Sequence, residues 1–210
     1  QRIEELVEQY YRLDKAKTLD QFLDALRLQA LPSINYVYAD RDGNIAYIYN
    51  GQFPERKPGF DWKGVLPGDR SDLIWHSYVP FDKIPKYINP ESGVLFNANN
   101  TPFRATTPSS DLDPSAFPDW MGIQTDMTNR AYRMEETFGS DPQITREEFR
   151  AYKFDVTYSE KSEMAKLLKQ VVSVDPGDDS DLAEAQDILR RWDMRATKDS
   201  RGAALAILMA

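Results

Sequence analysis

The 210-residue chain contains no cysteine, and this absence excludes several kinds of site at once. Without a thiol there is no disulfide, no thiolate-bound zinc and no cysteine nucleophile within the chain. Histidine is almost as scarce, because His76 is the only one, and no G-x-S-x-G sequence accompanies it. A Ser-His-Asp hydrolase arrangement is therefore disfavoured, since it would have to use His76.

Long apolar runs and clustered positive charge are also missing. No stretch approaches the roughly 20 apolar residues of a membrane-spanning helix. The net charge is −8, and phosphate binding needs clustered Lys and Arg, so neither nucleic acid nor an anionic membrane surface is expected as a partner. The remaining composition, 41% hydrophobic and 29% charged, is typical of a globular protein.

The chain opens with two segments of helical pattern. Apolar residues recur at helical spacing over residues 2–14, which predicts a helix with one apolar face. Thr18 and Gln21 form a capping-box sequence that predicts the start of a second helix. Pro32 is expected to end that helix, because proline cannot continue it.

A β-hairpin and a third strand are expected next. Residues 36–40 and 45–49 alternate in the manner of strands, and Asp42-Gly43 supplies the left-handed turn between them. Residues 51–92 are rich in Pro, Gly, Asp and Trp and predict a long ordered loop. Residues 93–97 are expected to form the third strand.

The second half of the chain has a helical pattern. Residues 103–124 are irregular, and a capping box follows at Thr145 and Glu148. Helices are expected at 125–138, after Thr145, at 159–172, at 182–192 and from 202 to 210. The predicted class is α+β, with helices, a hairpin and long loops in residues 1–125 and helices in 126–210.

The most informative segment is Asn97-Ala98-Asn99-Asn100-Thr101-Pro102, which follows the apolar run 94–96. Asn is depleted in strands, so three of them at an expected strand end suggest hydrogen-bond donors placed for a purpose. A fixed Asn side-chain amide can stabilise the oxyanion that forms during acyl transfer. A plain turn is the alternative interpretation, because Asn and Pro are ordinary turn residues.

A series of motifs gives this segment a context. In chain order they are 38–40 with 43–45 (Tyr-Ala-Asp and Gly-Asn-Ile), Val79-Pro-Phe81, Asn89-Pro-Glu-Ser-Gly93, 97–102, Asn129-Arg-Ala131, Leu189-Arg-Arg-Trp-Asp193 and Gly202-Ala-Ala204. Their order resembles the β subunit of the penicillin acylase family, which belongs to the N-terminal nucleophile hydrolases. The resemblance runs through nearly the whole chain, and it implies part of a four-layered αββα sandwich.

The resemblance also implies what the rest of the protein supplies. The family's nucleophile is a Ser, Thr or Cys at the very N-terminus of the processed β subunit, whereas this chain begins with Gln1, which has no nucleophilic atom. We therefore expect an internal fragment of a larger acylase that has no amidase activity by itself. Its partners would be the α subunit, the N-terminal part of the β subunit and a small acylated amide substrate. The family implies a periplasmic or secreted protein.

Two catalytic residues are carried over from the family. The first Asn of its paired Asn donates a side-chain amide to the oxyanion, and that position is Asn99. Asn97 and Asn100 are expected to bond neighbouring backbone groups instead. An Arg that helps to orient the nucleophile matches Arg130, with Arg133 as the competing candidate one helical turn later. A surface Arg on an amphipathic helix is the alternative for both.

One metal ligand is implied as well. In the family's calcium-binding members, an Asp in a Ser-Asp-Leu stretch contributes an oxygen ligand, and here that residue is Asp111. Carboxylate oxygens suit Ca2+, which would be structural in the whole enzyme and is not required for catalysis. Two other acidic segments, 40–44 and 175–181, are interpreted as a hairpin turn and a solvated loop with a helix cap.

The implied reaction is hydrolysis of an amide bond between an acyl group and an amine, such as a penicillin or an N-acyl-homoserine lactone. The nucleophile's own α-amine serves as the base, so no His is needed. A different class of function also fits the sequence, namely a non-enzymatic α+β binding module whose Trp- and Pro-rich loops grip a partner.

Overall fold

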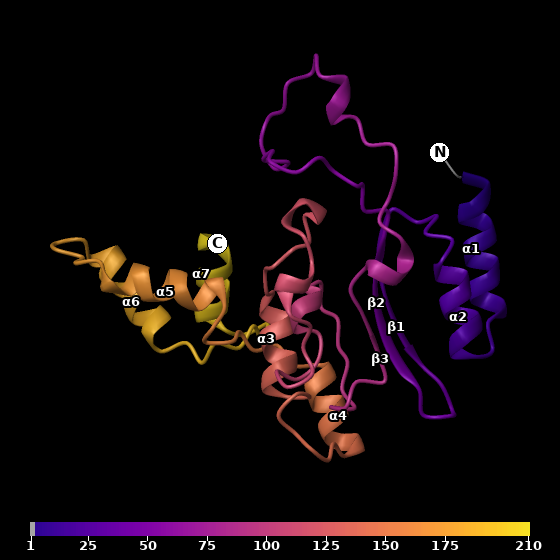
Figure 1. Ribbon diagram of the computed structural model, residues 1–210. Helices are drawn as coiled ribbons and strands as arrows, with labels where there is room; N and C mark the ends of the chain where they lie inside the picture. The colour runs from indigo at the N-terminus through magenta and orange to yellow at the C-terminus, as the bar shows by residue number, and fades with distance from the viewer. Residues whose placement is uncertain (1–2) are drawn as a thin grey trace. The chain divides into compact units, whose positions relative to one another are not determined.

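The computed structural model describes residues 3–210 and divides into two units, one ending at Asp126 and the other running from Met127 to Ala210 (Figure 1). The first unit contains a three-stranded antiparallel sheet, and the second unit is helical. This is the α+β arrangement expected from the sequence. In the described part of the chain, no helix is long and apolar enough to cross a membrane.

Two helices open the first unit, α1 (Ile3–Lys15) and α2 (Leu19–Leu26). The Thr18 hydroxyl accepts the backbone N–H of Gln21 at 3.3 Å, as the capping sequence predicts. The Gln21 side chain accepts the N–H of Lys17 at 2.8 Å rather than that of Thr18. Thr18 is therefore the N-cap of α2, but the reciprocal bond of the capping box goes to the residue before it.

Helix α2 is shorter than the sequence suggests, because it ends at Leu26 and not at Pro32. The N–H of Gln29 bonds the carbonyl of Leu26 at 3.0 Å, and Gln29 then adopts a left-handed conformation with φ of 45°. Its side-chain amide donates to the carbonyl of Gly51 at 3.0 Å. A contact to a distant strand thus stops the helix before the proline is reached.

The sheet has the order β1 (Ser33–Ala39), β2 (Ile45–Gly51) and β3 (Lys86–Ile88), with both pairings antiparallel. The expected hairpin is confirmed, since β1 and β2 pair from Ala39↔Ile45 to Ser33↔Gly51.

The hairpin turn is built on one carboxylate. Asp40 accepts the backbone N–H of Asp42 at 3.0 Å and that of Asn44 at 2.9 Å. Gly43 takes the left-handed conformation, with φ of 87°, that a three-residue hairpin loop needs. These contacts account for the acidic segment 40–44 as a turn.

The predicted position of the third strand is wrong. The strand is β3, inside the stretch 51–92 for which the composition predicts a long ordered loop, whereas residues 93–97, the predicted third strand, form no strand. There the Phe96 N–H bonds the carbonyl of Ala105 at 3.0 Å, and the Thr106 hydroxyl bonds the carbonyl of Val94 at 2.6 Å. The Thr106 side chain therefore takes a position that a backbone N–H of a neighbouring strand would occupy in a sheet.

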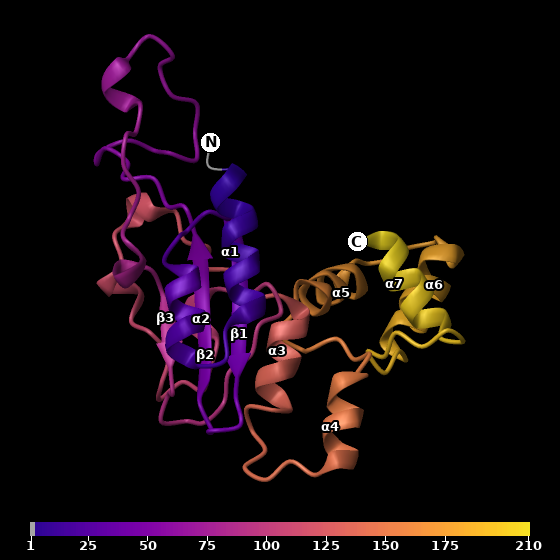
Figure 2. The ribbon, with the colours of Figure 1, turned by 90° about the vertical axis from the view of Figure 1, so that its right-hand side faces the viewer.

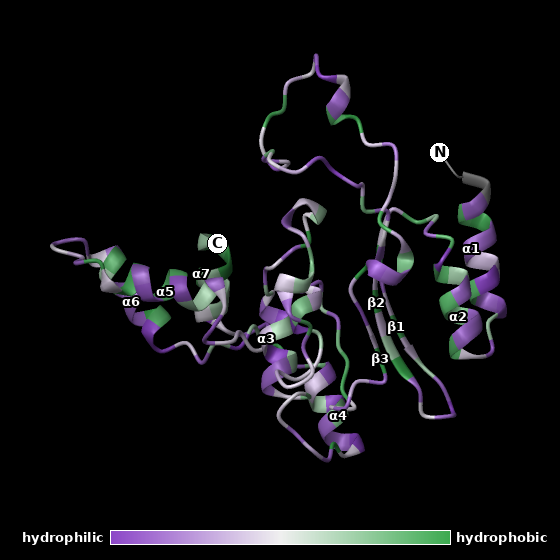
Figure 3. Cartoon of the chain, in the orientation of Figure 1, coloured by the Kyte–Doolittle hydropathy of each residue, from purple (hydrophilic) through white to green (hydrophobic). Residues whose placement is uncertain are grey.

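Both faces of the sheet are covered. Leu26, Ala46 and Ile48 are buried in one cluster, and α1 and α2 lie along this face of the strands in both views (Figures 1 and 2). Tyr47 and Tyr87 are buried in another cluster, which includes residues of the loops after β3. In Figure 3 apolar positions follow the strands, and green and purple positions alternate along the two helices, as expected for half-buried helices.

An irregular arm leaves the sheet after β2. A bridge between Pro54 and Tyr78 closes its base, and Figure 1 shows the segment between them extending away from the strands. Inside the arm the Trp62 and Trp75 rings meet edge to face, with centroids 6.2 Å apart. The arm also carries His76, which is exposed. These aromatic rings pack within the loop, although Trp75 remains 45% exposed.

The second unit consists of five helices: α3 (Asn129–Glu136), α4 (Arg146–Lys153), α5 (Glu163–Ser173), α6 (Ser180–Arg190) and α7 (Arg201–Met209). Each begins at a side-chain cap, in order Thr128, Thr145, Ser162, Asp179 and Ser200. The predicted capping box at Thr145 and Glu148 is complete. Asp179 shows that the acidic segment 175–181 contains the cap of α6.

Helices α5, α6 and α7 share a small core. Met164, Leu168, Leu189 and Ala206 are its buried members. Helix α7 approaches closely through Gly202, where an added Cβ would lie 2.5 Å from the Cβ of Trp192. The small residue at this position lets the helix and the indole pack together.

Candidate functional site

The Asn-rich segment borders a polar hollow of about 390 Å³ in the first unit. The lining residues come from both strands of the hairpin, from the segment itself and from one later residue: Ser33, Ile34, Asn35, Tyr49, Asn97, Asn99, Asn100 and Gln124. Neutral amides dominate the wall. Such a wall can donate and accept hydrogen bonds without carrying charge.

Asn97 fixes the turn from inside. Its side-chain oxygen accepts the backbone N–H of Asn99 at 3.0 Å and the side-chain amide of Asn35 at 3.4 Å. The first contact is an Asx-turn, in which Asn bonds the chain two residues on. Asn99 sits in the left-handed region, with φ of 59°.

Asn100 holds the same turn from the other side. It is 2% exposed, and its side-chain oxygen accepts the N–H of Ala98 at 2.8 Å. Its amide donates to the carbonyls of Thr101 at 3.1 Å and Arg104 at 2.6 Å. Asn97 and Asn100 therefore bond neighbouring backbone groups, as the sequence argument expected.

Asn99 differs from its two neighbours because it is exposed at the edge of the hollow. A side-chain amide at such a place is a suitable donor to a developing oxyanion. The catalytic role of Asn99 remains a prediction.

Five lining residues are not predicted from the sequence, and three of them bring an amide or a phenol to the wall: Asn35, Tyr49 and Gln124. Asn35 pairs with Tyr49 across the hairpin, and Asn within a strand was the available signal. Burial raises the pKa of Tyr49, and the N–H of Gln124, which bonds the phenol oxygen, lowers it only in part. Tyr49 is therefore a neutral group in this wall at ordinary pH.

The segment that carries Gln124 is pinned to the base of the arm. Arg56 donates through Nη1 to the carbonyls of Trp120 at 3.2 Å and Met121 at 3.5 Å. Gly122 follows in the left-handed conformation, with φ of 65°, and a Cβ there would lie 2.7 Å from Arg56 Nη1. A side chain at this position would therefore displace the Arg56 guanidinium.

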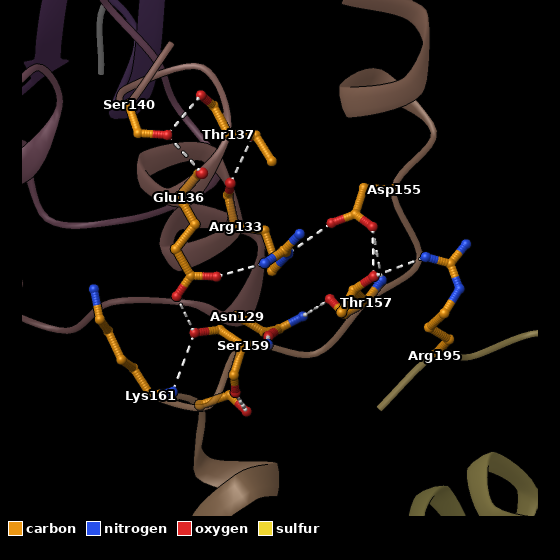
Figure 4. Close-up of polar contacts among 11 residues, drawn as sticks. Asn129, Arg133, Glu136, Thr137, Ser140, Asp155, Thr157, Ser159, Lys161 and Arg195 are labelled. Carbon is orange, nitrogen blue, oxygen red and sulfur yellow. Dashed lines mark hydrogen bonds and ion pairs between the residues drawn. The ribbon is translucent and has the colours of Figure 1, made fainter. Parts of the chain in front are cut away.

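The second predicted catalytic residue, Arg130, lies in the other unit. It is the second residue of α3 and is exposed. Its competitor Arg133 is engaged internally, because it forms ion pairs with Glu136 and Asp155, each at 2.6 Å (Figure 4). Arg133 thus supports the local structure. The catalytic role of Arg130 remains a prediction.

The ion pairs of Arg133 belong to a larger polar network, which Figure 4 shows around α3. Glu136 accepts the Ser159 hydroxyl at 2.6 Å, and Asp155 accepts the Thr157 hydroxyl at 2.6 Å. Burial alone would raise the pKa of Asp155, but the bonds from Thr157 and Arg133 outweigh burial and hold the pKa below its ordinary value.

Asn129 completes this network. Its side-chain oxygen accepts the N–H of Ser159 at 2.8 Å, and its amide donates to the carbonyl of Thr157 at 3.3 Å (Figure 4). The first residue of α3 therefore ties the helix to the segment that precedes α5.

Asp111, the predicted calcium ligand, is half-buried in the first unit. Its carboxylate accepts the N–H of Thr106 at 3.3 Å. It also lies beside Tyr87, whose pKa is raised mainly by burial and further by Asp111. Among residues 3–210 no three His, Cys, Asp or Glu side chains gather as a metal site. Asp111 offers one carboxylate of the kind that Ca2+ binds, and its role as a calcium ligand remains a prediction.

Comparison with known proteins finds a family and several relatives that this chain resembles. A family model described as Penicillin amidase matches residues 2–209. Penicillin G acylase of Escherichia coli is 40% identical over 98 residues, which are 47% of this chain and 11% of that protein. Acyl-homoserine lactone acylase QuiP of Pseudomonas aeruginosa is 32% identical over 103 residues, 48% of this chain and 12% of that protein.

The fold has a solved counterpart. The structure of a thermostable penicillin G acylase from Alcaligenes faecalis superposes with a TM-score of 0.63 at 25% identity. The superposition covers 93% of this chain and 33% of the solved chain. The chain thus spans about a third of that structure, and its alignments span about a tenth of the curated relatives.

Proposed function

The chain belongs to the penicillin amidase family, and from that premise we propose that it is part of an amidohydrolase that cleaves the bond between an acyl group and an amine. The observation that carries the proposal is the turn at Asn99. It holds an exposed amide at the edge of a polar hollow, where two neighbouring Asn residues fix the backbone.

In the proposed reaction, a nucleophile from outside this chain attacks the amide carbonyl, and its own α-amine takes the proton. The carbonyl oxygen then carries negative charge, and the Asn99 side-chain amide donates to it. The amine leaves, and water later releases the acyl group from the enzyme. Arg130 would help to orient the nucleophile.

The proposed substrates are small linear amides. Relatives are named for penicillin and for acyl-homoserine lactones, and both substrate types contain an acyl group on an amine. We propose that the remaining parts of the acylase complete the αββα sandwich and the acyl pocket. Asp111 would supply one oxygen to a structural Ca2+ there, and the protein would be periplasmic or secreted.

The decisive experiment replaces Asn99 in the full-length enzyme. Asn99→Ala should lower kcat by about 10²–10³-fold, the usual loss for one oxyanion donor. KM should change much less, because the contact strengthens mainly in the transition state. Gln143→Ala is the matched control, since it removes an exposed amide from the second unit and should leave kcat unchanged. Near-normal turnover by Asn99→Ala would exclude Asn99 from the site.

A binding role without catalysis is the second candidate, and one observation favours it. The arm exposes 61% of Ile74, 45% of Trp75 and 46% of Tyr78, which is the kind of surface that a partner can cover. Absence of amide turnover by the full-length protein, across penicillin-type and acyl-homoserine lactone substrates, would favour this alternative.

A further inference from the structure

We propose that Asn97 is a positioning residue that sets the direction of Asn99, with Asn35 as its support from the hairpin. The inference rests on the proposed function of Asn99 as oxyanion donor. It starts from one atom, the side-chain oxygen of Asn97, which accepts the Asn99 N–H at 3.0 Å and the Asn35 amide at 3.4 Å.

The backbone of Asn99 benefits from such support. Its φ of 59° lies in the left-handed region, which Asn adopts more readily than most residues but less readily than glycine. The Asx-turn of Asn97 stabilises this conformation, because it satisfies the Asn99 N–H only while the chain is folded back in this way.

The same bond controls where the Asn99 side chain can go. The backbone conformation fixes the Cα–Cβ direction and limits the side-chain rotamers. A catalytic group displaced by about 1 Å can lose 10²-fold in rate. A change in the turn at Asn97 would therefore reach catalysis through the placement of Asn99.

The neighbouring Asn100 serves a different purpose. It is 2% exposed and bonds three backbone groups, so its loss would disturb the fold of the whole turn. Asn97 is only half-buried, and among residues 3–210 its side chain forms two hydrogen bonds, both at its oxygen. It can therefore be replaced with less effect on folding, and this makes its role testable.

Asn35 extends the support to a regular element. It lies on β1 opposite Tyr49, so its position is fixed by the pairing of the hairpin. Its donation at 3.4 Å is longer than the Asx-turn bond and therefore weaker. We expect a smaller effect from Asn35 than from Asn97.

The test is a double-mutant cycle in the full-length enzyme with a chromogenic acyl anilide. Asn97→Ala should lower kcat about 10-fold and change KM less than twofold. Asn97→Ser should recover part of the loss, because a Ser hydroxyl can accept the same N–H. In an Asn99→Ala background, Asn97→Ala should lower kcat by less than a further twofold, since residues that act through one another are not additive.

The possible outcomes are distinct. If Asn99→Ala itself leaves kcat unchanged, the proposed function fails. If Asn99→Ala lowers kcat but Asn97→Ala is neutral, or lowers kcat equally in both backgrounds, the positioning role is overturned. Should Asn97→Ala fold poorly, Asn35→Ala gives the same reading, with an expected two- to threefold loss of kcat that disappears in the Asn99→Ala background.

Discussion

The turn around Asn99 and the helix around Arg130 have a similar arrangement of residues, but the side chains that support them differ in chemical type. In each, an exposed candidate residue lies within three positions of a side chain of the same type that is engaged internally: Asn97 and Asn100 in the turn, Arg133 in α3. The turn is held by neutral amides, whereas α3 is held by the ion pairs of Arg133 together with the amide of Asn129. Residue type alone therefore does not separate a candidate functional side chain from the side chains that support the backbone around it.

Support by neutral amides and support by ion pairs have different physical consequences. Neutral amides keep the same charge at every ordinary pH, so the turn depends on burial and on complete hydrogen bonding. The network of α3 includes the carboxylates of Glu136 and Asp155, whose bonds depend on their charge state. The two regions should respond differently to removal of a polar group and to acid.

The largest effect on stability is expected at Asn100. Asn100→Ala leaves the Ala98 N–H and the carbonyls of Thr101 and Arg104 without this partner in a buried place. The free energy of unfolding should fall by about 3 kcal/mol, as expected for unsatisfied buried groups. Urea unfolding of the chain measures this. Gln143→Ala is the control, because it removes an exposed amide from the second unit, and it should change stability by less than about 0.5 kcal/mol. Equal effects of the two variants would contradict the assignment of support to Asn100.

A smaller effect is expected when the charge at α3 is removed. Arg133→Met leaves Glu136 and Asp155 without their ion-pair partner, and the side chains of both are only partly exposed, at 26% and 14%. We expect a loss of about 1–2 kcal/mol, between the values for surface and buried pairs.

Arg191→Met is the matched control for this loss. It breaks an i,i+4 pair with Asp187 whose side chains are 72% and 55% exposed, and it should cost below about 1 kcal/mol. A larger loss at Arg191 than at Arg133 would show that the network does not stabilise the second unit.

The smallest effect is a change in pH dependence. The pKa of Asp155 is lowered in the folded protein, so its contribution to stability is present above the unfolded value of about 3.9 and is lost as the pH falls through the folded value. Asp155→Asn should therefore flatten the fall in stability between pH 5 and the acid limit. Urea unfolding at several pH values checks this, with Asp178→Asn in the exposed loop before α6 as control. An unchanged slope in Asp155→Asn would remove Asp155 as a source of the acid sensitivity.

Much of the fold could be predicted because its signals are local. Thr145 and Glu148 lie within one turn of each other, and the hairpin turn depends on residues 40–44 alone. The errors occurred where distant contacts decide. Helix α2 stops because Gln29 reaches Gly51, and residues 93–97 form no strand because Thr106 takes a place in the ladder.

The candidate site shows the same division. The Asn-rich turn is visible in the sequence as a cluster, and the bonds of Asn97 and Asn100 run to residues at most four positions away, apart from Asn35. Asn35 and Gln124 join the hollow only through pairing and packing. An Asn within a predicted strand is a weak local signal for Asn35, and Gln124 has no such signal. The motifs predict Asn99 as a candidate, but they do not predict the residues from the hairpin and from Gln124 that line the hollow beside it.

The long reach of these contacts also sets the order in which the molecule can assemble. The bond from Asn35 to Asn97 spans 62 residues, and the bond from Arg56 to Trp120 spans 64. Closing such long loops is slow, whereas helices with caps three residues apart form from nearby parts of the chain. During refolding we therefore expect the helices of the second unit to form early and the polar hollow to form among the last steps. The candidate site would then be the part of the chain that stays unfolded longest while the protein is being made.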